Sequence, residues 1–324
     1  MKQAVVTTRI RLARNLSTYP FPVRMSKEQK SKLCDEVSEV AKSIMDFDRI
    51  DMQNLTKTQA VSLVEQHLIS PEFITDPVGK TLLLSKDREV SIMINEEDHL
   101  RIQVIKSDLC LDEAYALADD IDTKLSKKLP FAFSDKLGFL TQCPTNLGTG
   151  MRASVMLHLP ALQKSRAVSK IASNLSKLGL TIRGIYGEST EPQGALYQLS
   201  NQVSLGINEQ SAIDNLKNIA SQLVTQELKA RERVLSDIEV VDQICRSLGV
   251  LKTARVIDHN EAMALLSNIR LGVSNKLFDS LSLDNIDKLI CDIQPAGILQ
   301  RYGENLSARE RDIKRADFLR EKLG

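Results

Sequence analysis

The pattern of apolar residues changes near Ser211, and this change constrains the fold more than any other feature of the sequence. Before Ser211, segments that alternate apolar and polar residues, as strands do, are mixed with segments of helical periodicity. After Ser211, helical periodicity continues to the end of the chain and strand patterns disappear. The 324 residues are enough for two domains. We therefore predict an α+β domain followed by an all-helical domain.

The individual elements of the α+β part follow from spacing and from capping residues. Ser26 and Gln29 form a capping-box pattern, so a helix is predicted behind them, and a second amphipathic helix is predicted over 114–125. After the loop at 143–150 we expect one or two further helices, interrupted near Pro160 and ending near Gly179. Alternation and short apolar runs predict strands at 5–12, 81–85, 90–95, 100–104, 180–186 and 195–205.

Composition excludes several classes of protein. The 43 Lys and Arg nearly balance the 42 Asp and Glu, which excludes a strongly basic nucleic-acid-binding protein. The 5 cysteines include no CxxC pair, and the 4 histidines show no metal-ligand spacing, so neither a disulfide framework nor a protein-held metal site is predicted. No apolar run reaches the roughly 18 residues of a membrane span, and the N-terminus lacks a signal-peptide core. We expect a soluble, cytoplasmic protein.

The segment 95–104 carries a first group of candidate functional residues. On an extended chain Glu97, His99, Arg101 and Gln103 would share one face, and apolar side chains would occupy the other. This row is either an ordinary solvated face or the floor of a polar site in which a carboxylate lies beside a cation.

The glycine-containing loop 143–150 is a second candidate. If a helix follows it, its backbone N–H groups would bind an anion, and this would explain Arg152 in the first turn, where a cation is otherwise unfavourable. The alternative is an ordinary glycine loop with an exposed arginine. Cys143 is either a reactive thiol or a buried structural cysteine.

Further arginines lie on predicted strands. Arg9 and Arg11 share one face of the first strand, and Arg183 is followed by two glycines and Glu188 on a predicted loop. Each could be a plain surface residue. Together with Arg101 and Arg152, however, they provide the planar cationic forks that bind phosphate oxygens.

Gly79-Lys80-Thr81 is not a P-loop, because Ile74 stands where that motif needs glycine. The residues alone thus indicate an arginine-lined nucleotide site and do not name the acceptor.

The four segments at 8–11, 95–101, 143–155 and 183–188 resemble, in order and separation, the motifs of the phosphagen (guanidino) kinase family. The resemblance covers roughly residues 4–234. It implies a catalytic domain over 4–234, with an antiparallel β-sheet flanked by helices, and a helical C-terminal domain over 235–324. It also implies that Glu97 and Glu188 face the acceptor guanidinium, with Cys143 close by, and that Mg²⁺ comes with ATP. The ATP site is implied to be lined by Thr7, Thr8, Arg9, Ile10, Arg11, His67, Arg101, Arg152, Ala153, Ser154, Val155, Met156, Arg183, Gly184, Ile185, Tyr186, Gly187 and Glu188.

Within the family the chain is most similar to the bacterial branch that phosphorylates arginine residues of proteins. Because the chain starts at Met1, the small helical domain that precedes the first arginine-rich strand in creatine and arginine kinases is expected to be absent. The C-terminal residues Arg311, Asp312, Ile313, Lys314, Arg315 and Ala316 also match the RDxxRA phosphoarginine-binding signature of that branch. From spacing alone, Ser307 and Glu310 cap a helix there, and Asp312 could hold the Arg315 guanidinium; the alternative is a solvated end helix.

The resemblance further implies a role in the stress response. The expected partners are a heat-shock repressor as substrate, the Clp unfoldase and protease, a small zinc-binding activator, and further copies of the chain in a homodimer or larger assembly. Two rival functions stay open from the sequence. One is a kinase for free arginine or another small guanidino compound, and the other is a non-catalytic module that binds phosphoarginine.

Overall fold

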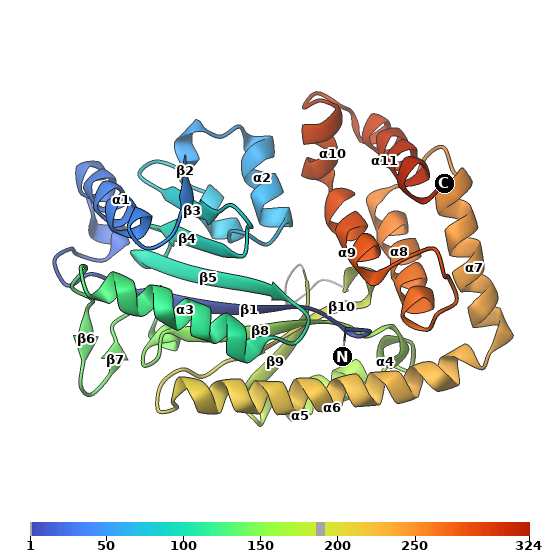
Figure 1. Cartoon of the computed structure of the whole chain (residues 1–324), viewed down its shortest axis with the longest axis horizontal. Helices are drawn as coiled ribbons and strands as arrows, with labels where there is room; N and C mark the ends of the chain where they lie inside the picture. Colours follow the sequence, from blue (N-terminus) through green and yellow to red (C-terminus); the bar gives the residue numbers. More distant parts are fainter. Residues whose placement is uncertain (1, 186–191) are drawn as a thin grey trace. The chain divides into compact units, whose positions relative to one another are not determined.

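The computed structural model describes residues 2–185 and 192–324, and Figure 1 shows the order of its elements. The chain forms two compact units, each built from separated stretches. The strand-rich unit comprises Thr7–Val155 and Ser200–Asn218, and the helix-rich unit comprises Met1–Val6, Met156–Leu199 and Ile219–Gly324. Among the described residues, no helix combines the length and the apolar character needed to cross a membrane.

An eight-stranded sheet is the central element, and its strands run in the order β2-β3-β4-β5-β1-β8-β10-β9. The pairs β1–β5, β2–β3, β3–β4 and β4–β5 are antiparallel, which confirms the predicted kind of sheet. The short pair Phe133–Ser134 (β6) and Gly138–Phe139 (β7) forms a separate ribbon. The strands of the large sheet are Val5–Arg14 (β1), Phe47–Asp51 (β2), Thr81–Ser85 (β3), Val90–Ile94 (β4), Leu100–Ser107 (β5), Met151–His158 (β8), Leu180–Gly184 (β9) and Leu196–Asn201 (β10).

The strand β1 has the alternation that the sequence predicted. Ile10 and Leu12 are buried, whereas Arg9 and Arg11 lie half-buried on the opposite face. In the antiparallel register with β5, Arg11 lies opposite Gln103 and Ala13 lies opposite Arg101. One residue of slippage would reverse both faces, so the buried Ile10 and Leu12 fix where the arginines point.

The strand-rich unit contains the helices Lys27–Lys42 (α1), Lys57–Glu65 (α2) and Leu111–Ser126 (α3). The Ser26–Gln29 capping box is present, and α3 runs along β5 (Figure 1). The sequence analysis missed β2 and α2. A second capping box, Thr56 with Gln59, is the signal that could have located α2.

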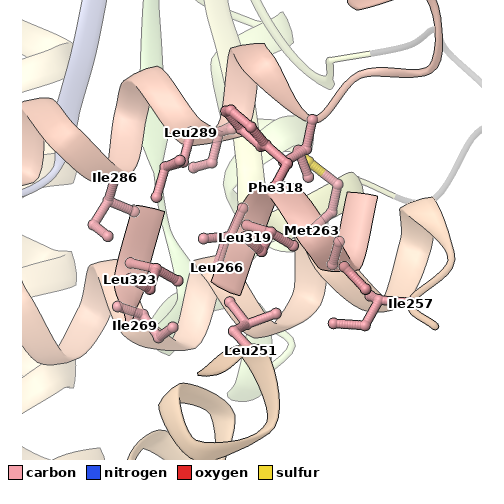
Figure 2. Packing of buried hydrophobic residues seen from close by; sticks show 14 of the residues in the cluster. Leu251, Ile257, Met263, Leu266, Ile269, Ile286, Leu289, Phe318, Leu319 and Leu323 are labelled. Carbon is pink, nitrogen blue, oxygen red and sulfur yellow. The ribbon is translucent and has the colours of Figure 1, made fainter. Parts of the chain in front are cut away.

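The helix-rich unit confirms the all-helical pattern predicted from about Ser211 onward. Its core is a cluster of buried apolar side chains from several helices, including Leu266 and Phe318 (Figure 2). The long helix α6 begins in the strand-rich unit and continues into the helix-rich one. The helices are Pro160–Lys164 (α4), Val168–Ser176 (α5), Glu209–Leu235 (α6), Ile238–Thr253 (α7), His259–Ser274 (α8), Leu283–Asp292 (α9), Pro295–Tyr302 (α10) and Ala308–Leu323 (α11).

The helix predicted directly after the 143–150 loop is wrong, because Met151–His158 forms strand β8. The residues Met151, Arg152 and Ala153 favour helix intrinsically, but a place inside the sheet overrides such weak preferences. Arg152 is consequently not in the first turn of a helix, so no helix dipole can bind an anion at this place. The helices near Pro160 and before Gly179 do form, as α4 and α5.

Two fully buried arginines fasten the first residues of the chain within the helix-rich unit. Arg231 on α6 donates to Glu227 Oε1 at 2.7 Å and to the Gln3 carbonyl at 3.0 Å. Arg270 on α8 donates to Asp287 Oδ1 at 2.6 Å and to the same Gln3 carbonyl at 2.9 Å. Both guanidinium groups therefore have a carboxylate partner, as buried charges require.

Candidate active site

Four arginines from three neighbouring strands meet in the strand-rich unit. Arg9 and Arg11 come from β1, Arg101 from β5 and Arg152 from β8. A cavity of about 150 Å³ opens between them, lined by Arg11, Arg101, Arg152, Ala13, Glu97, Cys143, Thr145, Asn146 and Gly150. Three of the predicted motifs thus converge on one cavity.

The positive charges in this cluster oppose one another. Burial lowers the pKa of Arg9 to about 10, with Arg152 and Arg101 as further causes. The pKa of Arg11 lies well below its ordinary value because of burial and the charges of Arg9, Arg101 and Arg152, while Glu96 acts in the opposite sense. The buried Nε of Arg11 also has no hydrogen-bond acceptor within the described part of the chain. A polyanion bound here would relieve the repulsion and supply the missing acceptor.

His67 lies beside this cluster in a backbone conformation with φ of 59°. Burial, and after it the charge of Arg9, lowers the pKa of His67 to about 4. The imidazole is therefore neutral at physiological pH and adds no further positive charge.

Arg101 is held by two neighbouring glutamates. Its Nη1 donates to Glu96 Oε1 at 2.8 Å, and its Nη2 lies 3.6 Å from Glu97 Oε2. Glu96 is almost completely buried and also accepts from the Ser70 hydroxyl, whereas Glu97 is 38% exposed. Glu96 thus neutralises Arg101, and Glu97 remains available to a molecule in the cavity.

Burial, followed by repulsion from Asp98, raises the pKa of Glu97, and this outweighs the opposing effects of Arg101 and a hydrogen bond from Cys143. The Cys143 sulfur also lies 3.0 Å from the Thr145 hydroxyl oxygen. A carboxylate with a raised pKa accepts a proton more readily than an ordinary surface glutamate.

The predicted row of Glu97, His99, Arg101 and Gln103 along one strand face is wrong. Residues 95–99 form a turn, and β5 begins only at Leu100. His99 is completely buried: its Nδ1 accepts from the Leu16 N–H and its Nε2 lies 2.9 Å from the Pro20 carbonyl. Gln103 is also buried and donates to the His67 carbonyl at 3.0 Å. Only Glu97 and Arg101 of this row reach the cavity.

The loop 143–150 is held tightly, and its glycines are needed for that. Gly148 has φ of +98°, and a Cβ there would lie 2.4 Å from the Ser204 carbonyl oxygen. Gly150 has φ of +61°, and a Cβ there would lie 2.7 Å from the Ala13 carbonyl oxygen. The loop therefore approaches β1 closely and presents Cys143 to the cavity through backbone packing.

A buried ion pair that the sequence analysis did not identify supports this arrangement. Arg14, next to the cavity wall on β1, forms a forked contact with Asp122 on α3, with Nη2 to Oδ2 at 2.9 Å. Its Nη1 donates to the Thr149 carbonyl at 3.0 Å. Arg14 and Glu96 give no signal in the sequence that separates them from surface charges, because only their partners in the fold reveal their roles.

The remaining residues of the implied ATP site are placed as follows. The Thr7 side chain is half-buried, whereas Thr8 is buried and donates to the Asp108 carbonyl at 2.7 Å. Ile10, Ala153 and Val155 are buried, and Met156 is half-buried. Ser154 accepts from Arg9 Nε at 3.5 Å. Arg183, Gly184 and Ile185 belong to the helix-rich unit, and Tyr186, Gly187 and Glu188 lie outside the described residues.

The RDxxRA segment lies on α11 of the helix-rich unit, behind a capping box of Ser307 and Glu310. The predicted contact of Asp312 with Arg315 is present, with Nη1 to Oδ1 at 2.7 Å. Arg315 is, however, only 1% exposed, and it also donates to the Ile293 and Ile257 carbonyls at 3.1 and 3.0 Å. Arg311, Asp312, Ile313 and Lys314 are half-buried, and Ala316 is buried. The accessible polar groups are therefore those of Arg311, Asp312 and Lys314.

The cavity can bind a polyphosphate through its arginines and a second, cationic group through Glu97. This is the electrostatic arrangement that phosphoryl transfer requires, with cations around the transferred group and a base at the acceptor.

Comparison with known proteins agrees with this chemistry. A model of the family "ATP:guanido phosphotransferase, C-terminal catalytic domain" matches residues 28–230, and a model of "Protein-arginine kinase McsB C-terminal domain" matches residues 237–324. The protein-arginine kinase of Clostridium acetobutylicum is 42% identical over 98% of this chain and 96% of its own length. That of Halothermothrix orenii is 44% identical over 99% of this chain and 93% of its own.

Solved structures show the same fold. A lombricine kinase superimposes with a TM-score of 0.62 at 22% identity, covering 70% of this chain and 67% of that one. A duplicated taurocyamine kinase from Schistosoma mansoni, with bound components of a transition-state analogue, gives 0.63 at 25% identity. That match covers 95% of this chain and 41% of the duplicated one. The chain therefore belongs to the protein-arginine kinases of the ATP:guanido phosphotransferase family.

Proposed function

We propose that the arginine cluster binds the phosphates of ATP and that Glu97, together with Glu188, holds the guanidinium of the arginine to be phosphorylated. The observation that carries this proposal is the convergence of Arg11, Arg101 and Arg152 on one cavity, with Arg9 close enough to interact with Arg152 and Arg101. Such a concentration of charge costs stability in the empty protein and favours binding of a polyanion.

The acceptor requires a carboxylate, because an arginine guanidinium keeps its proton at neutral pH and is a poor nucleophile. A carboxylate can accept hydrogen bonds from the guanidinium fork, direct one nitrogen at the γ-phosphorus, and take up the proton that is released. The Glu97 carboxylate reaches the same cavity as the arginines and has a raised pKa, so it suits this task. Glu188 is assigned the same task on the family resemblance alone.

Mg²⁺ would accompany the nucleotide in this proposal. The described residues contain no group of three or more His, Cys, Asp or Glu side chains that could hold a metal ion. Two carboxylates near the cavity already have protein partners: Glu96 accepts from Arg101 and Ser70, and Asp98 accepts from Asn15 and the Gln142 N–H. Phosphate oxygens and water would therefore supply most of the ligands of the cation, as is usual for Mg²⁺ at nucleotide sites.

The test is to replace Glu97 or Glu188 by glutamine. We expect the rate of phosphoryl transfer to fall by about 10²–10⁴, the usual contribution of a positioned base, while ATP still binds. Phosphate on an unfolded protein and on free arginine is measured by mass spectrometry at neutral pH, because P–N bonds are acid-labile. Glu232→Gln, at an exposed position on α6, is the control. Unchanged turnover in either variant would refute the role of that residue.

For α11 we propose a phosphoarginine-binding role. The Asp312 carboxylate is 27% exposed and is held in place by Arg315. It can accept from the guanidinium part of phosphoarginine, while Arg311 and Lys314 reach the phosphoryl group. In this arrangement the buried Arg315 positions Asp312.

The cellular role is proposed on the family resemblance alone. It places the enzyme in the cytoplasm and in the stress response, with a heat-shock repressor among its substrates and the Clp protease acting on the marked proteins. A small zinc-binding activator and a homodimer or larger assembly belong to the same proposal.

A further inference from the structure

The turn at 95–99 places Glu97 between two buried carboxylates, Glu96 and Asp98. Glu96 accepts from Arg101 at 2.8 Å, and its Oε2 accepts from the Glu97 N–H at 3.0 Å. Asp98, on the other side, is only 2% exposed. The Glu97 side chain is 38% exposed and lines the arginine cavity, so its two neighbours hold its backbone while its own carboxylate stays accessible.

One oxygen of Asp98 joins separate segments of the strand-rich unit. Its Oδ1 accepts from Asn15 Nδ2 at 2.6 Å, directly after β1, and from the Gln142 backbone N–H at 2.7 Å. Asn15 extends the connection, because its Oδ1 accepts from the His99 N–H at 2.9 Å and its Nδ2 also donates to the Leu140 carbonyl at 3.0 Å. The turn, the end of β1 and the segment that leads into the loop 143–150 are therefore held together through Asp98 and Asn15.

These hydrogen bonds are adjacent in sequence to two residues of the cavity. Glu97 directly precedes Asp98, and Cys143 directly follows Gln142. Both Glu97 and Cys143 line the cavity, and the Cys143 thiol donates to the Glu97 carboxylate. Hydrogen bonds to a carboxylate are shorter and stronger than those between neutral groups. Asp98 therefore fixes the turn that carries Glu97 against the loop that carries Cys143.

The charge of Asp98 has an effect of its own. Its Oδ2 is buried and has no hydrogen-bond donor in the described part of the chain, and burial raises the pKa of Asp98. A neutral asparagine could form the same two hydrogen bonds through one oxygen without burying a charge. The charge does act on Glu97: after burial, repulsion from Asp98 is the next cause of the raised pKa of Glu97, ahead of the effects of Arg101, Glu96 and Cys143.

We infer that Asp98 is a positioning residue for phosphoryl transfer, which fixes Glu97 and Cys143 towards one acceptor guanidinium and makes Glu97 a stronger base. The inference rests on the proposed role of Glu97. Asp98 acts through these two neighbours and is itself buried. Its effect can be large, because a displacement of about 1 Å in a site of this kind can lower a rate about 100-fold.

The test compares two variants of the full-length enzyme. Asp98→Ala removes both hydrogen bonds and the charge, whereas Asp98→Asn keeps an acceptor oxygen and removes only the charge. Asp51→Ala is the matched control, because Asp51 also accepts from two side chains, those of Arg49 and Thr81, but does not line the cavity. The acceptor is reduced and carboxymethylated lysozyme, an unfolded protein. Melting temperature and ATP affinity show whether each variant is folded.

We expect Asp98→Ala to lower kcat about 10- to 100-fold and to leave KM for ATP within about twofold of the wild type, because the displaced groups face the acceptor. Asp98→Asn should keep most of the rate and shift the acid limb of kcat/KM to lower pH, since Glu97 loses a repelling charge and its pKa falls. A kcat of Asp98→Ala no lower than that of Asp51→Ala would overturn the positioning role. An unmoved acid limb in Asp98→Asn would overturn the role of the charge.

A second measurement follows the loop without using turnover. Alkylation of Cys143 by iodoacetamide, located by peptide mapping, should become several-fold faster in Asp98→Ala, because the loop has lost its bond to the turn and the thiol a repelling charge. Unchanged alkylation would contradict the connection between the turn and the loop. If Glu97→Gln leaves turnover unchanged, the proposed role of Glu97 fails, whereas the alkylation rate still reports on Asp98. The two failures are therefore distinguishable.

Discussion

Two groups of arginines, one half-buried and one fully buried, differ in what surrounds them. In the strand-rich unit, Arg9 and Arg11 lie among other arginines, and burial together with these charges lowers the pKa of both. In the helix-rich unit, Arg231, Arg270 and Arg315 each contact a carboxylate within 2.7 Å and donate to main-chain carbonyls as well. We propose that the first group binds an anion, whereas each member of the second group is paired with a carboxylate of the protein.

The comparison teaches that burial alone does not mark a functional arginine. All members of the second group are at most 1% exposed, yet their hydrogen bonds hold helices and the N-terminal residues together. What distinguishes an arginine that binds a ligand from one that stabilises the fold is whether a carboxylate of the protein already pairs with its guanidinium. Removing a binding arginine should cost activity, and removing a paired one should cost stability.

Arg270→Met should have the largest effect on stability. The change leaves the Asp287 carboxylate and the Gln3 carbonyl without their buried partner, and we expect a loss of about 3–5 kcal/mol in the free energy of unfolding. Urea titration measures it. Arg246→Met breaks an exposed pair with Asp242 and should leave the free energy of unfolding nearly unchanged, because water screens exposed pairs. Equal effects in the two variants would remove the distinction between paired buried arginines and surface ones.

Arg311 and Arg315 allow the same distinction to be tested within one helix. Arg311→Ala should weaken binding of a phosphoarginine peptide about tenfold, or about 1.4 kcal/mol, without lowering the melting temperature, because Arg311 is half-buried and accessible. Arg315→Ala should lower both affinity and melting temperature, because Arg315 is buried against two carbonyls. Unchanged affinity of both variants by calorimetry would assign α11 a purely structural role.

Each arginine group also contains a neutral histidine, and this predicts a pH dependence. Burial and Arg9 lower the pKa of His67 to about 4, whereas burial, Arg270 and Arg231 lower the pKa of His158. The folded state therefore binds fewer protons than the unfolded state, and stability is lost as the pH falls from about 6.5 towards 4. His67→Gln should flatten this decline only in part, since His158 still contributes. Denaturant titrations at several pH values measure the slope, and an unchanged slope would contradict the neutral imidazole in the cluster.

The sequence was informative about the fold wherever the apolar pattern was strong. The alternation of β1, the capped helix α1 and the helical C-terminal part were all predictable, because burial imposes a period on the residues. Strand β8 was not, because Met151, Arg152 and Ala153 favour helix by themselves and only the neighbouring strands make them extended.

The site was predictable only in part, for a similar reason. Resemblance to family motifs singled out Arg9, Arg11, Glu97, Arg101 and Arg152, and the structure places four of them on one cavity wall with Arg9 beside them. It could not identify Glu96 as the buried partner of Arg101. Spacing alone had placed His99 and Gln103 in one row with Glu97 and Arg101, although both are buried in the fold. Which of two adjacent glutamates is buried depends on a turn at 95–99 that no residue spacing reveals.

The most direct test of the account is the free energy of unfolding of Arg11→Gln, measured with and without ATP. Arg11 is half-buried among like charges and its Nε has no acceptor among the described residues, so its removal should leave the ATP-free protein at least as stable as the wild type. The variant should also lose most of the stabilisation that ATP gives the wild type. A loss of several kcal/mol without ATP, with full stabilisation by ATP retained, would contradict the account and place Arg11 with the structural arginines.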